Sequence, residues 1–224
     1  MPLAPTAFPN LRVVDHPLVR VRVTRLRDRT TPTRDFRRAV RDLGVLLGYE
    51  GTAHLRTVRV PVATPLETTD GDALPRPPTV VPVLRAGLGL ADGVLDVLPE
   101  ARVGHLGLRR DEKTLAPISY YAKLPPGAEA GPVILVDPML ATGGTGVAAL
   151  DQLKARGCRD LVFLVAIACP EGARRLLERH PDVPVIAAVL DHRLDERGFI
   201  RPGVGDAGDR IFGTLDLALA EGCG

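Results

Sequence analysis

The chain has 224 residues, of which 45% are hydrophobic and 4% aromatic, and its 29 basic and 27 acidic side chains leave a formal net charge of +2. This length and composition suit one domain with a real core, and the missing basic excess argues against a dedicated nucleic-acid-binding protein. No run approaches 18 apolar residues and no basic segment precedes an apolar one at the start, so we expect no membrane span or signal peptide. The three scattered cysteines predict no metal site and suit a cytoplasmic protein.

The first third of the chain gives few clear elements. Residues 1–15 are rich in proline and lack periodicity, and we expect a loose arm there. Thr33 can cap a helix that runs to about residue 47. The apolar side chains on one face of that helix are Phe36, Val40, Leu43 and Leu47. Residues 55–62 alternate like a half-buried strand or hairpin arm, whereas the polar, proline-rich residues 64–78 predict a surface connection.

From residue 79 onward, short apolar runs alternate with amphipathic stretches. The expected strands are 80–84, 103–108, 133–136, 161–168 and 183–190, and the expected helices are a stretch with Leu90, Val94 and Leu98 inward, 143–154 and 171–179. The pattern predicts an α/β fold in which a mainly parallel, twisted sheet is flanked by helices, with an N-terminal arm and helix and a β-hairpin extension. Ligands bind beyond the carboxyl ends of such strands, so the loops after Leu84, Leu108, Val136 and Leu190 are where we expect chemistry.

The loop after Val136 is the most informative segment of the sequence. It reads Asp137-Pro138-Met139-Leu140-Ala141-Thr142-Gly143-Gly144-Thr145 and leads from a buried strand into a helix. The two glycines allow close backbone approach, the threonines add hydroxyl donors, and the new helix presents free N–H groups, which together predict a phosphate cradle. A carboxylate at Asp137 would repel the phosphate itself but could accept hydrogen bonds from sugar hydroxyls. The segment therefore predicts a site for a ribose 5-phosphate group.

Two other phosphate-binding motifs fit less well. A P-loop needs a lysine after its glycines, and none follows Gly144. Gly87-Leu-Gly89 follows a strand and precedes Asp111 by about twenty residues, which would suit a nicotinamide-dependent oxidoreductase, but Asp92 occupies the position of the third glycine. A Gly-Gly pair can also be a simple turn.

The loop resembles the phosphoribosyl pyrophosphate signature of type I phosphoribosyltransferases, in the version typical of uracil phosphoribosyltransferases, and the resemblance extends over residues 16–214. Residues 80–89 resemble the pyrophosphate loop of that family, where the Arg85 guanidinium could clamp a diphosphate. Arg110 matches a family arginine that binds the same substrate, while Arg109 stands where tyrosine is common. The resemblance implies phosphoribosyl pyrophosphate contacts by Arg85, Arg110, Asp137, Pro138, Met139, Leu140, Ala141, Thr142, Gly143, Gly144, Thr145 and Asp206.

A glycine-rich segment near the end of the chain is the candidate base site. Four glycines between residues 203 and 213 predict a loop without regular helix, whose backbone amides can surround a small planar ligand. The string Gly-Val-Gly-Asp-Ala-Gly-Asp at 203–209 resembles the uracil-binding string of the family. It implies uracil contacts by Ile200, Gly205, Asp206 and Ala207, within a base-binding region at 191–214. The sequence departs from the family pattern at Gly51, Arg201 and residues 191–195.

The resemblance implies a single-domain enzyme over residues 1–224 that joins uracil to phosphoribosyl pyrophosphate and releases UMP and pyrophosphate. It implies Asp206, Arg110 and Arg85 as catalytic residues, Mg²⁺ as cofactor, a mobile hairpin at 109–126, a homo-oligomer (dimer or higher) and GTP as a possible effector. Two alternatives stay open, namely a non-catalytic regulator that senses phosphoribosyl pyrophosphate and a phosphoribosyltransferase for another base.

Overall fold

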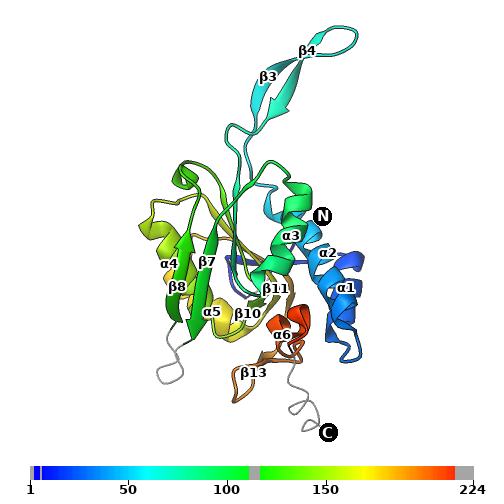
Figure 1. Cartoon of the computed structure of the whole chain (residues 1–224), viewed down its shortest axis with the longest axis vertical. Helices are drawn as coiled ribbons and strands as arrows, with labels where there is room; N and C mark the ends of the chain where they lie inside the picture. Colours follow the sequence, from blue (N-terminus) through cyan, green and yellow to red (C-terminus); the bar gives the residue numbers. More distant parts are fainter. Residues whose placement is uncertain (1–2, 6, 111–116, 215–224) are drawn as a thin grey trace.

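The computed structural model describes residues 3–5, 7–110 and 117–214, and one ten-stranded sheet dominates it (Figure 1). Its strands follow the order β1-β2-β12-β11-β9-β5-β7-β8, with β10 added to β11 and β6 added to β5. The strands of this sheet are β1 (Leu3–Pro5), β2 (Leu11–Val14), β5 (Thr79–Leu84), β6 (Arg102–Val103), β7 (His105–Arg110), β8 (Pro117–Lys123), β9 (Val133–Val136), β10 (Met139–Leu140), β11 (Leu161–Ala168) and β12 (Val185–Leu190).

The interior of the sheet is parallel and its two edges are antiparallel. Neighbouring strands from β2 to β7 pair in parallel, while β1 pairs with β2, and β8 with β7, in the antiparallel sense. Parallel strands are normally covered on both faces, which explains why the inner strands carry continuous apolar runs rather than alternating ones. The predicted α/β fold with a mainly parallel sheet is therefore confirmed.

Helices cover both faces of the sheet and create two cores. One face packs against α1 (Pro17–Arg27), α2 (Thr33–Gly51), α3 (Gly87–Val97) and the short α6 (Ala207–Phe212), and the other against α4 (Gly144–Ala155) and α5 (Pro170–Arg179). Alternate side chains of β11 serve the two cores, since Val162 and Leu164 join the first and Leu161 and Phe163 join the second. None of the helices within the described ranges is long and apolar enough to cross a bilayer.

Helices α2 and α3 approach so closely that backbone meets backbone. A Cβ atom on Gly93 would overlap the carbonyl oxygen of Arg41, and one on Gly44 would overlap the carbonyl oxygen of Leu90. These are backbone atoms on packed helices, and neither side can move without separating the pair.

Gly93→Ala is therefore expected to lower the free energy of unfolding by about 3 kcal/mol, at the upper end for an overpacked core. For a chain of this size that corresponds to a fall in Tm of roughly 6–12 °C. Gly48→Ala is the matched control, because its Cβ would lie 3.4 Å from Cα of Val94 and the alanine favours helix. Equal Tm values for Gly93→Ala and the wild type in a calorimetric scan would contradict the tight contact.

The N-terminal region is more ordered than its sequence indicates. We predicted a loose arm over residues 1–15, but β1 pairs with β2, and β2 pairs in parallel with β12 and buries Leu11 and Val14. That prediction was therefore wrong for residues 3–5 and 11–14. The helix α1 was not predicted. Its N-cap is His16, whose Nδ1 accepts a hydrogen bond from the Leu18 N–H at 3.2 Å. The predicted helix from Thr33 is confirmed as α2, although Pro32, not Thr33, is its N-cap residue.

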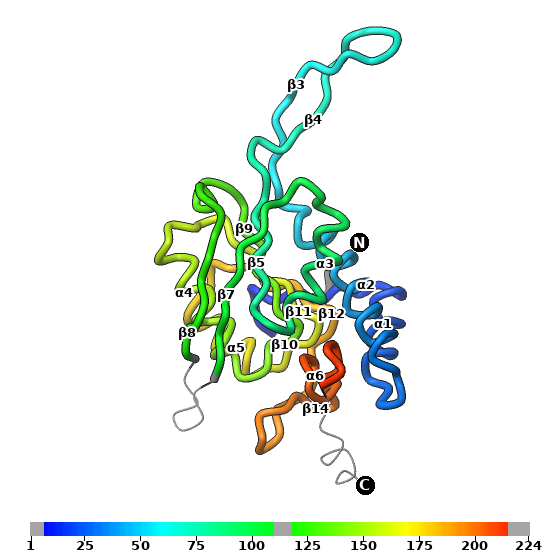
Figure 2. Tube along the Cα trace, in the orientation of Figure 1, coloured from blue at the N-terminus to red at the C-terminus, as the bar shows by residue number. Residues whose placement is uncertain are grey.

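A β-hairpin projects from the end of the molecule opposite α6 (Figures 1 and 2). Its strands β3 (Val58–Ala63) and β4 (Thr68–Ala73) pair only with each other. The structure corrects two expectations, since residues 64–78 contain a strand and the side chains of β3 are mostly exposed rather than half-buried. The exposed apolar side chains of the hairpin are Val58, Val62 and Leu66.

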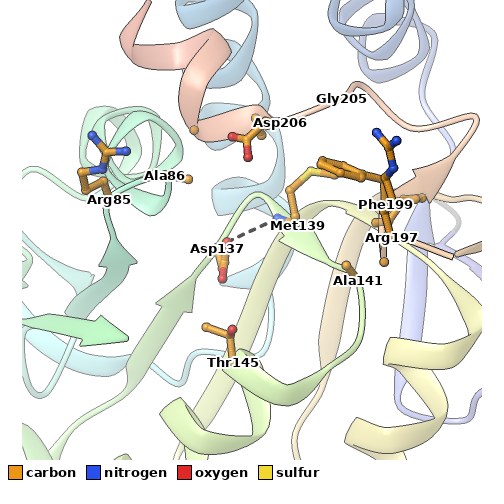
Figure 3. A pocket seen from close by; sticks show the side chains of 14 residues that line it. Arg85, Ala86, Asp137, Met139, Ala141, Thr145, Arg197, Phe199, Gly205 and Asp206 are labelled. Carbon is orange, nitrogen blue, oxygen red and sulfur yellow. Dashed lines mark hydrogen bonds between the residues drawn. The ribbon is translucent and has the colours of Figure 1, made fainter. Parts of the chain in front are cut away.

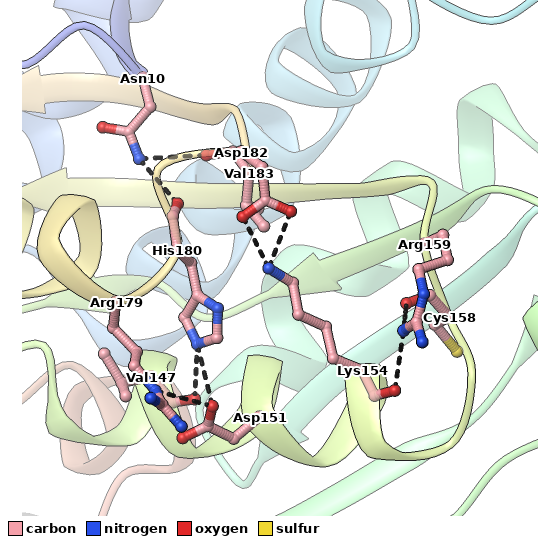
Figure 4. A network of polar contacts seen from close by, with 10 residues as sticks. All are labelled: Asn10, Val147, Asp151, Lys154, Cys158, Arg159, Arg179, His180, Asp182 and Val183. Atoms are coloured by element: carbon pink, nitrogen blue, oxygen red, sulfur yellow. Dashed lines mark hydrogen bonds and ion pairs between the residues drawn. The ribbon is translucent and has the colours of Figure 1, made fainter.

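Polar contacts tie α4 to the segment that follows α5 (Figure 4). Lys154 on α4 pairs with Asp182 at 2.7 Å, and Nε2 of the buried His180 lies 3.3 Å from the Val147 carbonyl oxygen. Asn10, just before β2, donates a hydrogen bond to the His180 carbonyl oxygen at 3.3 Å. These contacts fix α4, whose first turn follows the predicted phosphate loop.

Candidate active site

Loops from three parts of the chain enclose a pocket of about 410 Å³ beyond the carboxyl ends of β5 and β9 (Figure 3). Two other hollows of similar size lie among surface residues, but this one combines convergent polar groups with a topological switch of the sheet. The predicted site residues that line it are Arg85, Asp137, Met139, Ala141, Thr145, Ile200, Gly205, Asp206 and Ala207.

The loop after β9 wraps around the N-terminus of α4. Gly143 is the N-cap residue, has the left-handed φ of 77° and makes no side-chain capping hydrogen bond. A Cβ on Gly143 would lie 2.9 Å from the Gly172 carbonyl oxygen, so glycine is required by both conformation and space. The first N–H groups of α4 are thus oriented for an anion. Thr142, Gly143 and Gly144 do not line the pocket, and both glycines are buried. The predicted contacts Pro138 and Leu140 are also buried and do not line it.

Asp137 directly follows β9 and lines the pocket (Figure 3). Its Oδ1 accepts a hydrogen bond from the Met139 N–H at 3.3 Å, the interaction drawn in the figure. Burial of the carboxyl disfavours the charged form and raises the pKa of Asp137 to about 7, although the hydrogen bond from Met139 opposes the shift.

The family resemblance implies that Asp137 accepts hydrogen bonds from the ribose hydroxyls of phosphoribosyl pyrophosphate. On that expectation, kcat/KM for this substrate should rise with pH through about 7, because only the ionised carboxylate offers all its oxygen lone pairs. Below that pH the value should fall by up to about tenfold per pH unit. The Asp137→Asn variant should lack this rise of kcat/KM with pH. The Asp206→Asn variant, which leaves Asp137 in place, should keep it. Substrate ionisation affects all three proteins equally, so identical profile shapes in the wild type and Asp137→Asn would contradict the assignment.

The two arginines predicted to hold pyrophosphate differ in what the structure describes. Arg85 follows β5 in the sequence, is exposed, and lines the pocket with its guanidinium 5.6 Å from the ring centroid of Phe212. Arg110 ends β7, but its side chain lies outside the described residues, as does much of the connection between β7 and β8. The antiparallel pairing of those strands confirms the predicted hairpin at this position, while its mobility stays a prediction.

Asp206 lies in the glycine-rich segment 203–209, called the base loop from here on, and lines the pocket. It is the N-cap of α6, and its Oδ1 accepts a hydrogen bond from the Asp209 N–H at 2.9 Å. The expectation that glycines exclude regular helix here was wrong, because this cap starts a helix that includes Gly208. Gly205 has a φ of 75°, and no hydrogen bond within the described residues uses the N–H group of Gly205 or Ala207.

An ion pair between the partly exposed Arg27 and the buried Asp191 holds the base loop against α1. Arg27 donates to both oxygens of Asp191, at 2.5 and 3.1 Å, and the same carboxylate accepts the Gly203 N–H at 2.9 Å. The Asp191 side chain is 2% exposed. Next to this pair, the buried Arg210 donates to the carbonyl oxygens of Val204 and Leu26. The loop is therefore positioned by groups that lie outside the pocket.

The comparisons with known proteins agree with this geometry. The sequence profile of the family described as uracil phosphoribosyltransferase matches residues 13–214. The chain belongs to the uracil phosphoribosyltransferase family. It is 52% identical over 210 residues to the uracil phosphoribosyltransferase of Paracoccus denitrificans, covering 92% of this chain and 98% of that protein.

Solved structures carry the same fold. A protein from Aquifex aeolicus matches with a TM-score of 0.85 and 36% identity over 90% of this chain and 97% of that one. The adenine phosphoribosyltransferase of Leishmania donovani, at 16% identity, matches with a TM-score of 0.57 over 85% of this chain and 87% of that one, and this likeness concerns the fold alone. The predicted type I phosphoribosyltransferase fold is thus confirmed.

The structure adds pocket residues that the motifs did not point to. Ala86, Arg197, Gly198, Phe199 and Gly208 also line the pocket. The one signal in the sequence was the position of Phe199, directly before the predicted uracil contact Ile200.

Three family departures and one rejected motif have structural explanations. The Arg201 guanidinium pairs with Asp195 at 2.7 Å, and Gly51 lies where a Cβ would come within 2.5 Å of the Leu164 side chain. Arg109 is exposed. A Cβ on Gly87 would lie 2.6 Å from the Val136 carbonyl oxygen, so that glycine serves packing, and the dinucleotide interpretation does not fit a uracil phosphoribosyltransferase.

Proposed function

We propose that this enzyme transfers the phosphoribosyl group of phosphoribosyl pyrophosphate to N1 of uracil, forming UMP and pyrophosphate in the cytoplasm. The observation that carries the proposal is a single pocket in which the end of the phosphate loop, Asp137 and the base loop face one another (Figure 3). The spacing suits one substrate that spans a phosphate, a ribose and a base. Family membership names the base.

In this reaction the bond from the anomeric carbon to pyrophosphate breaks, the bond to uracil N1 forms, and the N1 proton is lost. Little covalent work falls to the protein, so positioning and charge placement dominate. The N-terminus of α4 and Thr145 hold the 5-phosphate, and Asp137 accepts hydrogen bonds from the ribose hydroxyls. Asp206 faces the same space and orients the base, where its carboxylate also opposes the positive charge that develops on the sugar.

The leaving pyrophosphate needs positive charge, which Arg85 supplies on one side of the pocket and Arg110 supplies from the end of β7. A Mg²⁺ ion fits this site, since such ions are held by one or two carboxylates together with substrate phosphates, and Asp137 and Asp206 both line the pocket. Among the described residues no cluster of three acidic, histidine or cysteine side chains forms a separate metal cage. When bound, Mg²⁺ would neutralise pyrophosphate charge.

Base choice resides in the loop that contains Ile200, Gly205 and Ala207. Uracil presents alternating acceptors and donors along its edge, and backbone N–H and C=O groups can match that order. The N–H groups of Gly205 and Ala207 are available for this purpose. Cytosine would leave buried groups mismatched, which penalises it strongly.

The test is UMP formation from uracil, phosphoribosyl pyrophosphate and Mg²⁺ with purified full-length chain. Turnover that depends on all three supports the proposal. Calorimetric binding of phosphoribosyl pyrophosphate without turnover, with GTP present, would instead support a regulator that senses this metabolite.

The family resemblance also implies a homo-oligomer and activation by GTP, and both belong to the proposal. The exposed apolar side chains of the β3–β4 hairpin, Val58, Val62 and Leu66, support an assembly through this arm. Light scattering should give a dimer or larger for the wild type and a smaller species for Val62→Asp with Leu66→Asp. A monomeric wild type, or a rate unaffected by GTP, would contradict the corresponding part.

A further inference from the structure

One arginine beside the phosphate loop has no partner among the residues that the structure describes. Arg175 is exposed on α5, and its guanidinium takes part in none of the hydrogen bonds or ion pairs formed by the described residues. Helix α5 supports the loop from behind. Its N-cap Cys169 donates through its thiol to the Ala141 carbonyl oxygen at 3.0 Å, and a Cβ on Gly172 would overlap that same oxygen. Arg175 follows Gly172 by three residues and so lies one turn further on the same side of α5.

The Arg175 side chain runs along the outer side of the loop. A Cβ on Gly143 would lie 3.2 Å from the Arg175 Cβ, and one on Gly144 would lie 3.3 Å from its Nη1 and 3.7 Å from its Cζ. The Thr142 hydroxyl oxygen is 3.7 Å from that same point on Gly144. The guanidinium thus ends beside Gly144, the first residue of α4, and the Thr142 hydroxyl also lies near that residue.

The positive charges around this position favour the binding of an anion. The guanidinium sits beside the positive end of the α4 dipole, an arrangement that is unfavourable until an anion arrives. Glu171, four residues earlier on the same face of α5, forms no ion pair with Arg175, and its Oε1 instead accepts the Leu194 N–H at 3.0 Å. Arginine suits phosphate oxygens better than lysine does, since its planar fork can donate two parallel hydrogen bonds.

We propose that Arg175 is an additional 5-phosphate-binding residue, which contacts the phosphate of ribose 5-phosphate groups from the outer side of the loop. This proposal rests on the proposed function for the identity of the substrate. Under this proposal the enzyme has two distinct anion-binding sites, each with its own arginine. Arg175 serves the 5-phosphate at α4, whereas Arg85 serves pyrophosphate on the other side of the pocket.

The experiment compares Arg175→Gln with the wild type in the full chain. Kd for ribose 5-phosphate and for UMP, measured by calorimetry, should rise about five- to tenfold, as for the loss of one charge-assisted hydrogen bond. KM for phosphoribosyl pyrophosphate should rise by a similar factor, whereas KM for uracil and Kd for pyrophosphate should not change. Arg175→Lys should lose less than Arg175→Gln.

Arg174→Gln is the matched control, since Arg174 is the exposed neighbour on α5 and its replacement removes the same charge. An equal loss in this variant, or a loss of pyrophosphate affinity equal to that for ribose 5-phosphate, would show a general field effect and overturn the proposal. Unchanged ribose 5-phosphate affinity in Arg175→Gln would also overturn it. Because these binding measurements need no turnover, they remain decisive even if the wild type forms no UMP, a result that would sink the proposed function alone.

Discussion

Asp206→Asn is expected to lower kcat/KM for uracil about 100-fold, the usual scale for a group that stabilises charge in a transition state. The free energy of unfolding should hardly change, because asparagine is as good an N-cap as aspartate and can still accept the Asp209 N–H. Asp206→Ala should lose both the activity and the cap. Activity assays combined with thermal unfolding of the two variants separate the chemical role of the carboxylate from its structural one.

Asp209→Asn provides the control for this prediction. Asp209 lies three residues further along α6, its Oδ1 accepts a hydrogen bond from the Thr214 hydroxyl, and it does not line the pocket. The same change of charge should therefore have a far smaller effect on kcat/KM. If Asp206→Asn and Asp209→Asn were equally active, the carboxylate of Asp206 would have no role beyond capping.

Asp191→Ala is expected to have a second large effect, this time from outside the pocket. It removes the partner of Arg27 and leaves the Gly203 N–H without its acceptor, which should lower the free energy of unfolding by about 3 kcal/mol. The base loop loses its position as well. KM for uracil should rise about tenfold or more, since small displacements of a binding loop are costly, while KM for phosphoribosyl pyrophosphate should change less.

The Arg41–Asp96 pair offers a matched comparison. Arg41 donates to both oxygens of Asp96, at 2.9 and 2.7 Å, in the same two-bond arrangement as the pair of Arg27 with Asp191. Both of its side chains are largely exposed, so Asp96→Ala should change stability little and leave both KM values unaltered. Equal increases of the two KM values in Asp191→Ala would indicate general damage and contradict a specific role in positioning the base loop.

The central strands and the phosphate loop could be predicted because their signals are local. Each inner strand is a continuous apolar run, and the segment from Asp137 to Thr145 carries its own turn and anion-binding chemistry. The features that were missed depend on distant partners. The strand β2 joins the parallel part of the sheet by pairing with β12, some 170 residues away.

Two helices were missed for a different reason. The alternating valines and arginines of residues 19–23 resemble a strand, yet Val19, Val23 and Leu26 lie on one buried face once a proline and the His16 cap start α1. In the base loop, the Asp206 cap outweighs the low helix propensity of Gly208. The pairing of Arg27 with Asp191, which holds the base loop in place, could not be predicted from the sequence, because 164 residues separate the two.

The most direct test of the central claim is kcat/KM for uracil measured alongside cytosine, hypoxanthine and orotate, with phosphoribosyl pyrophosphate and Mg²⁺ in each assay. The account predicts UMP from uracil and at least about 10⁴-fold lower values for cytosine and hypoxanthine, whose hydrogen-bonding edges differ from that of uracil, because a site built from hydrogen-bonding groups rejects mismatches to that degree. Orotate shares that edge and tests only whether a carboxylate at C6 is excluded. A comparable kcat/KM for cytosine or hypoxanthine would contradict the assignment of uracil to the loop that contains Gly205 and Ala207.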